Sequence, residues 1–315
     1  MPSQEIEIIP YSPDLKIEWD AFVENSKNGT FLFLRDYLDY HADRFPDNSF
    51  LIFRKGKLYS LLPATSKDSI LFSHAGLTYG GLIMNSKCSA EGILSAFNAL
   101  IDRIKTNGFK SLIYKPVPHI YHSIPSEEDL YALFRNHATL LARNISSTVN
   151  FKNPLKIQPT RRSEIKKALE NNIIVSRSHN FKGFWRILED NLRSKYAAAP
   201  VHSLNEILSL AESFPENIKL FIAEKEGELL AGILCYFSRQ VVHTQYISAN
   251  DEGKRLGAVD AIIDYLLNLY SSNFSFFDFG TSCGDGGRFL HESLIYHKQS
   301  FGARGICYDT YQISL

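Results

Sequence analysis

The chain has 315 residues, more than one hydrophobic core usually holds, so two domains are expected. Basic and acidic side chains number 34 each, so no net charge draws the protein toward nucleic acid or an anionic membrane. The N-terminus lacks the pattern of a signal peptide, no apolar run is long enough to cross a bilayer, and the four cysteines form no C-x-x-C pair. We therefore expect a soluble, cytoplasmic protein with reduced thiols and without membrane insertion.

The first half of the chain is predicted to begin with helices over 17–23 and 33–44 and to continue with a hairpin over 51–62 that turns at Gly56. An amphipathic helix follows, because apolar residues recur at helical spacing. These residues are Ile93, Phe97, Leu100, Ile101 and Ile104. A strand led by Phe109 comes next.

Two glycines between this hairpin and this helix, Gly80 and Gly81, follow Tyr79. They predict either a bulge or close backbone approach at a strand end, or a plain hairpin bend. The residues alone favour neither alternative.

The second half is predicted to repeat this order, with helices over 161–170 and 181–196 and a hairpin over 221–234 that turns at Gly227. The apolar face of its next helix comprises Val259, Ile262, Ile263, Leu266 and Tyr270. A strand led by Phe274 follows that helix.

Both halves also carry an Ala-Arg pair that enters a last strand, at Ala142-Arg143 and at Ala303-Arg304. Four matched elements in one order favour duplication of an α/β unit over chance similarity. We predict two domains, over 1–152 and 153–315.

Arg161 and Arg162 are expected at a helix start, where the helix dipole disfavours cations. Such a placement favours a grip on an anion such as phosphate or carboxylate. A solvated basic face is the alternative.

A glycine-containing segment joins the strand that ends near Ser248 to the next helix. Its exposed amides near Gly253 and Gly257 are suited to a pyrophosphate. The segment matches neither Walker A nor the dinucleotide fingerprint, and an ordinary strand-to-helix loop explains it equally well.

The stretch from Phe274 to Tyr308 predicts a buried strand, a glycine-rich loop, a helix and a last strand. Asp278 lies in the first strand and Lys298 near the end of the helix. This order places a carboxylate and a lysine near one loop, as a group-transfer site requires. The spacing of the histidines does not fit a zinc-binding helix, and we expect no metal.

The order of hairpin, strand, glycine-containing turn, amphipathic helix and strand resembles the GNAT acyltransferase fold. Its duplication, with four short motifs, resembles the FemABX-type branch, which includes peptidyltransferases of cell-wall synthesis. The motifs are Tyr79-Gly80-Gly81, Arg161-Arg162-x-x-Ile165-Lys166-Lys167-Ala168, Phe277-Asp278-Phe279-Gly280 and Lys298-x-x-Phe301-Gly302-Ala303. The resemblance covers nearly the whole chain and implies an α/β protein of two tandem GNAT-like domains. Each would be a mixed, mostly antiparallel twisted sheet flanked by helices.

The function that the resemblance implies is N-acyl transfer in the second domain, from acyl-CoA or an acyl carrier protein thioester to a small-molecule or peptide amine. The contacts implied for the donor are Arg255, Leu256, Gly257 and Ala258, and those implied for the acceptor are Arg161, Arg162 and Tyr79. Two other functions remain open: an aminoacyl-tRNA-dependent peptidyltransferase acting on a cell-wall precursor, and a non-catalytic GNAT-fold binding protein. The neutral charge and the absence of a long charged heptad segment count against binding of charged tRNA.

Three residues are the candidates for catalysis. Lys298 is expected to stabilise developing or phosphate negative charge, Asp278 to act as the base or to orient it, and Tyr246 to protonate the leaving group. Each has a structural alternative: Lys298 as a helix C-terminal cation, Asp278 as a loop cap, and Tyr246 as a core aromatic residue.

Overall fold

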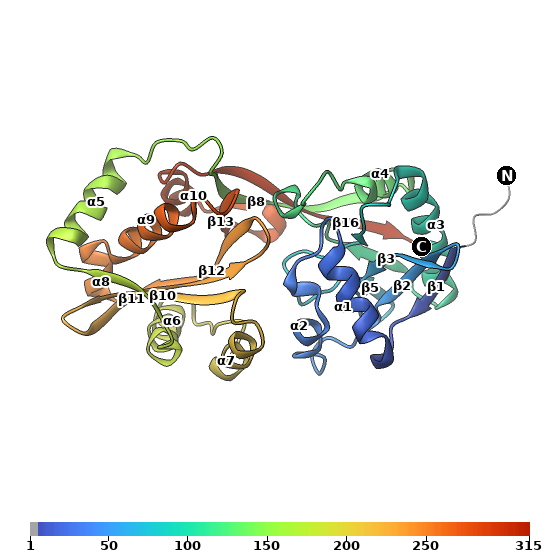
Figure 1. The fold of residues 1–315 in the computed structure, drawn as a ribbon, viewed down its shortest axis with the longest axis horizontal. Helices are drawn as coiled ribbons and strands as arrows, with labels where there is room; N and C mark the ends of the chain where they lie inside the picture. The colour runs from blue at the N-terminus through green and yellow to red at the C-terminus, as the bar shows by residue number, and fades with distance from the viewer. Residues whose placement is uncertain (1–5) are drawn as a thin grey trace. The chain divides into compact units, whose positions relative to one another are not determined.

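The computed structural model describes residues 6–315, and the chain divides into two compact units (Figure 1). Unit 1 comprises the chain up to Asn144 together with Cys283–Phe289 and Cys307–Leu315. Unit 2 comprises Ile145–Ser282 and Leu290–Ile306. The predicted single boundary between residues 152 and 153 differs from this division, because each unit includes segments from both halves of the sequence.

Two sheets and the helices that cover them form unit 1. The elements are β1 (Ile6–Pro10), α1 (Lys16–Asn25), α2 (Arg35–Asp39), β2 (Phe50–Arg54), β3 (Lys57–Leu62), β4 (Thr65–Lys67), β5 (Ile70–Phe72), β6 (Ile83–Met84), α3 (Ala90–Thr106), β7 (Ser111–Tyr114), α4 (Glu128–Arg135), the first part of β8 (Thr139–Asn150) and most of β16 (Arg304–Ser314). One sheet has the order β1-β2-β3-β6, and the other runs β4-β5-β7-β16-β8. The pairing of β5 with β7 is parallel, whereas β7 and β16 are antiparallel.

The predicted hairpin over 51–62 is confirmed as β2 and β3, with Gly56 at φ +70° in the turn. The helix predicted over 33–44 is shorter than expected, since only α2 is helical there. Arg35, in the first turn of α2, is 1% exposed, and its guanidinium binds Asp39 and Asp47. The chain turns after α2, which brings Asp47 back to this buried cation.

Gly80 marks a close approach of two backbone segments, so the first of the two alternatives for this glycine is confirmed. A Cβ atom at residue 80 would lie 1.8 Å from the carbonyl oxygen of Ser73. The Gly80 amide donates a hydrogen bond to the carbonyl oxygen of Lys115 at 2.8 Å. No larger side chain fits here without moving the backbone.

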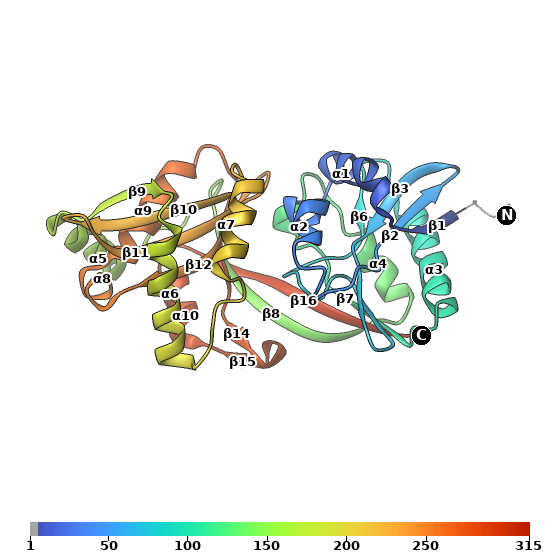
Figure 2. The same cartoon turned by 90° about the horizontal axis from the view of Figure 1, so that it is seen from below.

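One large sheet with helices on both faces forms unit 2. The elements are the second part of β8, α5 (Pro159–Glu170), β9 (Ile174–Ser178), α6 (Phe181–Tyr196), α7 (Leu204–Ser213), β10 (Ile218–Lys225), β11 (Glu228–Phe237), β12 (Val241–Ala249), α8 (Asp251–Leu256), α9 (Ala258–Tyr270), β13 (Phe276–Thr281) and α10 (Glu292–Gln299). Its strand order is β8-β13-β12-β11-β10-β9. Figure 2 labels β8, β12, β11, β10 and β9, and Figure 1 labels β13. Helices α6 and α7 lie on one face, and α5 and α9 lie on the other (Figure 1).

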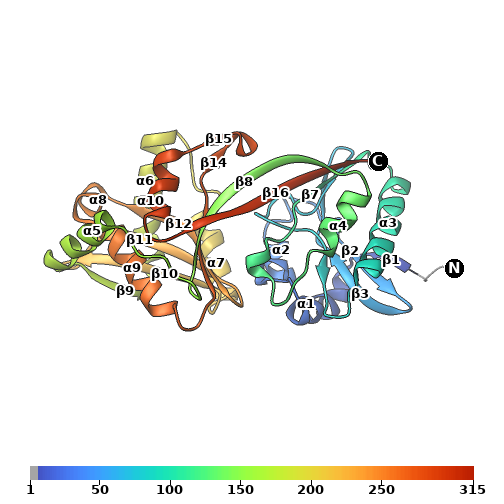
Figure 3. The ribbon, with the colours of Figure 1, turned by 90° about the horizontal axis from the view of Figure 1, so that it is seen from above.

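The helices predicted over 161–170 and 181–196 are confirmed as α5 and α6, and the hairpin over 221–234 as β10 and β11. After β13, two short strands, β14 (Cys283–Gly284) and β15 (Phe289–Leu290), form a two-stranded sheet (Figure 3). None of the helices within residues 6–315 is both long and apolar enough to cross a membrane.

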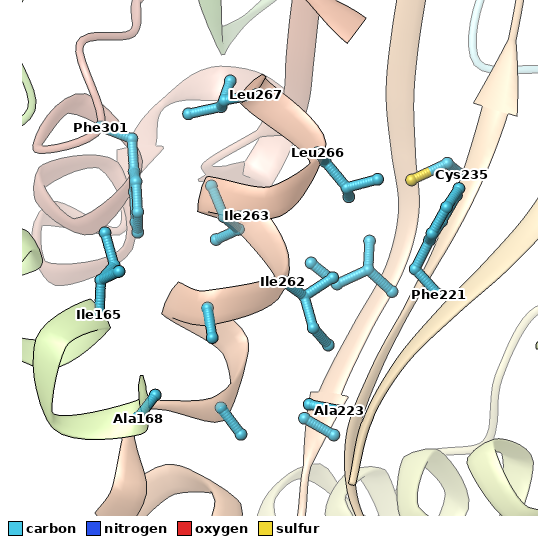
Figure 4. Packing of buried hydrophobic residues seen from close by; sticks show 14 of the residues in the cluster. Ile165, Ala168, Phe221, Ala223, Cys235, Ile262, Ile263, Leu266, Leu267 and Phe301 are labelled. Atoms are coloured by element: carbon cyan, nitrogen blue, oxygen red, sulfur yellow. The ribbon is translucent and has the colours of Figure 1, made fainter. Parts of the chain in front are cut away.

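Helix α9 supplies much of the core of unit 2. Ile262, Ile263 and Leu266 are fully buried and lie between α5 and the sheet (Figure 4). Each such side chain stabilises the fold by about 1.5–3 kcal/mol relative to an exposed position. On the sheet, Phe221 and Cys235 face this helix. The predicted amphipathic helix therefore packs against β10, β11 and β12 of the sheet.

Candidate active site

Three adjacent strands of unit 2 carry a row of polar side chains. On β13, Asp278 is paired in register with His243 of the parallel strand β12 and with Thr148 of the antiparallel strand β8. Ser146, two residues before Thr148, points to the same face because side chains alternate along a strand. The sheet therefore brings together four polar residues that are up to 132 residues apart in sequence.

The Asp278 carboxylate is fully buried and accepts hydrogen bonds on both oxygens. Ser146 Oγ and Thr148 Oγ1 donate to Oδ1 at 2.5 and 2.8 Å, and His243 Nδ1 donates to Oδ2 at 2.8 Å. Burial raises the pKa of this carboxyl, but the hydrogen bond and charge of His243 and the two hydroxyl bonds outweigh burial and lower the pKa to about 2. Asp278 lies inside β13, so its alternative role as a loop cap is wrong.

His243 is a residue of this site that the sequence analysis did not single out. In the neutral form of His243, a hydrogen from Nδ1 to Asp278 leaves Nε2 as the nitrogen with a free lone pair. The His243 side chain is 15% exposed, and no group among the described side chains and backbone bonds to Nε2. One titratable side chain in the apolar start of β12 was the available signal, and its partner follows only from the parallel pairing of β12 with β13.

Gly280 shapes the space beside this imidazole. Its φ of +73° is in the left-handed region that favours glycine. A Cβ atom at residue 280 would lie 3.3 Å from His243 Cε1 and 3.9 Å from Nε2. The glycine therefore leaves one edge of the ring uncovered.

Lys298 is brought to the same loop. Its side chain is 5% exposed, and Nζ donates hydrogen bonds to the carbonyl oxygens of Gly280 and Thr281, both at 2.8 Å. Lys298 lies in the last turn of α10, as its structural alternative requires, and it also fixes the backbone that follows β13. The prediction that Asp278 and Lys298 lie near one loop is confirmed; their catalytic roles stay predictions.

Strands β12 and β13 run side by side for only three residue pairs. The last pair joins His243 to Asp278. Beyond it, β12 continues to Ala249 and pairs with β11, but within the described chain no strand pairs with its other edge. The amide and carbonyl groups along that edge from Thr244 to Ser248 are therefore without a strand partner, whereas the Ala249 carbonyl oxygen accepts a hydrogen bond of 2.7 Å from Asn191 Nδ2.

The segment predicted to hold the donor lies between α8 and α9. Gly257, with φ +73°, ends α8 and precedes α9, and a Cβ atom there would lie 2.6 Å from the carbonyl oxygen of Glu164. Leu256 and Ala258 are buried in the core, whereas Arg255 is exposed and pairs with Glu252 at 3.3 Å. Of the four predicted contacts, only Arg255 and the backbone are therefore placed to meet a ligand.

Arg161 is engaged by another protein group. Its guanidinium donates to Asp260 Oδ1 at 2.8 Å, which joins the start of α5 to the first turn of α9. Asp260 is 7% exposed, and burial raises its pKa although Arg161 lowers it. This ion pair supplies a structural reason for a cation at the start of α5. Arg162 is exposed, and its predicted contact with an anion is untested.

The two predicted tyrosines lie in different units. Tyr246 of β12 packs edge-to-face on Trp185 and shares a hydrogen bond of 2.7 Å with His202 Nδ1. Burial raises the pKa of Tyr246, which keeps its hydroxyl protonated. Tyr79 belongs to unit 1, where it is 4% exposed and packs on Tyr121. A substrate contact by Tyr79 stays a prediction.

Unit 2 therefore has the features of one class of protein. A hairpin and a third strand lead through a glycine turn into a buried helix, and a parallel strand follows that parts from its neighbour. Unit 1 repeats the order of hairpin, helix and strand. This is the tandem GNAT fold.

Solved structures give the same fold. FemX superposes with a TM-score of 0.70 at 12% identity, over 98% of this chain and 97% of FemX. L-PGS from Bacillus licheniformis gives 0.62 at 11%, over 95% and 91% of the two chains. A tandem GNAT protein from the clavulanic acid biosynthesis pathway gives 0.51 at 9%, over 98% of each chain. No sequence-family model matches the chain, and no curated protein matches it at a significant level. The predicted fold class, an α/β protein of two tandem GNAT-like, FemX-like units, is confirmed.

Proposed function

We propose that unit 2 transfers an acyl or aminoacyl group to an amine, with acyl-CoA or an acyl carrier protein thioester as the leading donor. The observation that carries this proposal is the free edge of β12 beyond the His243–Asp278 pair. Unpaired backbone amides and carbonyls bind an extended ligand that itself contains amides, in the way that a peptide adds to a sheet edge. The arm of CoA is such a ligand.

The donor thioester would then lie beside the buried dyad. Its phosphates would meet the backbone between α8 and α9, where the start of a 13-residue helix favours an anion. Arg255 is the exposed cation of that segment. Holding the thioester carbonyl against an amine in this geometry supplies several kcal/mol of the barrier reduction.

Three catalytic roles belong to this proposal. Lys298 stabilises negative charge through the loop that it binds at Gly280 and Thr281. Asp278 orients a base, because a fully buried carboxylate with both oxygens bonded is a poor direct acceptor of a substrate proton. Tyr246 supplies a proton to the leaving group.

The structural neighbours support both candidate donors. The tandem GNAT protein, which was solved without AcCoA, supports a CoA thioester as the donor. FemX and a lysylphosphatidylglycerol synthetase domain from Agrobacterium fabrum, at 12% and 8% identity, support aminoacyl transfer as the second candidate. The net charge of zero favours the first, since binding of RNA normally draws on clustered cations. A non-catalytic binding protein is the third candidate.

One set of experiments tests the three candidates. We expect CoA to bind in a calorimetric titration and acetyl-CoA to release thiol in the presence of at least one member of a panel of primary amines. Transfer from charged tRNA that weakens steeply with salt, without binding of CoA, would favour the second candidate. Binding of an amine or of CoA without turnover of either donor would favour the third. Failure of all three measurements would refute the proposal.

A further inference from the structure

Of the described titratable groups near the free edge of β12, His243 alone combines access with a fixed orientation. Asp278 is fully buried, and the Lys298 ammonium is bound to two backbone carbonyls. The Tyr246 hydroxyl is bonded to His202. His243, by contrast, turns one nitrogen to Asp278 and keeps Nε2 without a protein partner among the described residues.

We infer that His243 is the general base of unit 2 and that Asp278 is its positioning residue. This inference rests on the acyl transfer to an amine proposed above and names the base of that site. It follows from the position of His243 at the last paired residue of β12 and β13, where the free edge begins.

The carboxylate of Asp278 is arranged to hold one imidazole tautomer. The hydroxyls of Ser146 and Thr148 both donate to Oδ1, so Oδ2 is the oxygen that faces His243. Since a carboxylate can only accept hydrogen bonds, Nδ1 must carry hydrogen and Nε2 is left as the proton acceptor. The other titratable side chain in register with His243 is Tyr236 of β11, which is 4% exposed.

The groups named above account for every proton and electron pair in the transfer of the acyl group from the thioester to the amine. An acceptor that enters as the ammonium ion gives one proton to Nε2, and the lone pair of the resulting amine forms the new C–N bond at the thioester carbonyl. The C–S bond then breaks, and its electron pair leaves with sulfur. The second proton lost by the amine nitrogen ends on the thiolate, with Tyr246 as its relay, and the imidazolium returns its proton to water. The products are an amide, a free thiol and one proton.

Two variants separate a base from a structural partner of Asp278. His243→Gln keeps an amide donor for Asp278 but cannot take a proton. We expect it to lower kcat for acetyl-CoA-dependent thiol release about a hundred- to ten-thousand-fold with KM for the thioester little changed. His243→Ala should regain activity when imidazole is added to the solution. His119→Gln, which alters an exposed histidine of unit 1, is the matched control and should keep full activity.

The role of Asp278 has a spectroscopic test that needs no substrate. In the neutral imidazole, the ¹⁵N shifts of His243 should show hydrogen on Nδ1 and none on Nε2. Asp278→Asn should abolish that preference, and Ser146→Ala is the milder variant should the first not fold. An Nε2–H tautomer in the unaltered protein would overturn the inference.

The inference and the proposed function fail in different ways. Turnover that survives in His243→Gln, or no rescue of His243→Ala by imidazole, would overturn the inference and leave acyl transfer intact. Absence of turnover with every donor would refute acyl transfer. In that case, diethyl pyrocarbonate still tests the base: Nε2 of His243 should react, and CoA should protect it. An unreactive Nε2 would overturn the inference on its own.

Discussion

The buried carboxylate of Asp278 has a stability contribution that can be calculated from the structure. Its pKa is about 2 in the folded protein, against an ordinary value of 3.8. At about 1.4 kcal/mol per pH unit, this difference corresponds to about 2.5 kcal/mol. Because the folded pKa is the lower one, this stability is present above pH 3.8 and is lost as the pH falls from 3.8 toward about 2. Asp278→Asn should therefore destabilise unit 2 by about 2–3 kcal/mol at pH 7, and by less near pH 3.

The two tryptophans make the measurement specific, since Trp19 lies in unit 1 and Trp185 in unit 2. In a Trp19→Phe background, urea unfolding followed by Trp185 fluorescence monitors unit 2 alone. The matched control is Glu170→Gln, which removes an exposed carboxylate of unit 2 that lies 3.5 Å from the exposed Lys166 ammonium. It should cost less than about 1 kcal/mol. Equal stability of Asp278→Asn and the parent at pH 7, or a difference that does not shrink in acid, would refute the reasoning.

Three further predictions concern other groups. Burial raises the pKa of Asp129 from 3.8 to about 6, so the stability that its protonated carboxyl confers is present below pH 3.8 and is lost as the pH rises through 6. Relative to the parent, the free energy of unfolding of Asp129→Asn should therefore rise by about 3 kcal/mol between pH 4 and pH 7. Urea unfolding followed by Trp19 fluorescence measures this difference, and a difference that does not change with pH would contradict the prediction. Lys298→Met leaves two carbonyls without their donor and should cost about 3 kcal/mol and most of the turnover, whereas Lys298→Arg should retain more of both. Gly257→Ala would place a Cβ atom 2.6 Å from the Glu164 carbonyl oxygen, at a residue whose φ of +73° disfavours any side chain. Calorimetry should therefore show that the variant binds CoA at least tenfold more weakly than the parent. Unchanged affinity would exclude this turn from the donor site.

Local patterns were sufficient for most of the elements. The helix predicted over 181–196 is α6 with its observed bounds, and Gly227 marked the turn of the β10–β11 hairpin. Both depend on neighbours within a few residues, where periodicity and turn chemistry act. The helix expected over 33–44 is shorter than predicted, and the chain beyond it brings Asp47 to the buried Arg35. That ion pair has no local pattern.

The candidate site divides in the same way. Asp278 and Lys298 were found from the sequence because a charge in a buried strand and a lysine after a glycine loop are visible locally. His243 was missed because it becomes notable only when the parallel pairing of β12 and β13 sets it against Asp278. Arg161 was predicted to bind an anion because its protein partner, Asp260, lies on α9, 99 residues further along the chain, where no local pattern indicates it.

The sequence by itself determined the two α/β repeats, their hairpins and helices, and the segment that carries Asp278 and Lys298, because periodicity, turns and motifs are local properties of the chain. Only the tertiary structure decided that β8 pairs with β13, and that β16, at the end of the chain, pairs with β7. It also decided which side chains face the buried carboxylate. Strand register joins residues far apart in sequence, and no local pattern specifies which strands will meet.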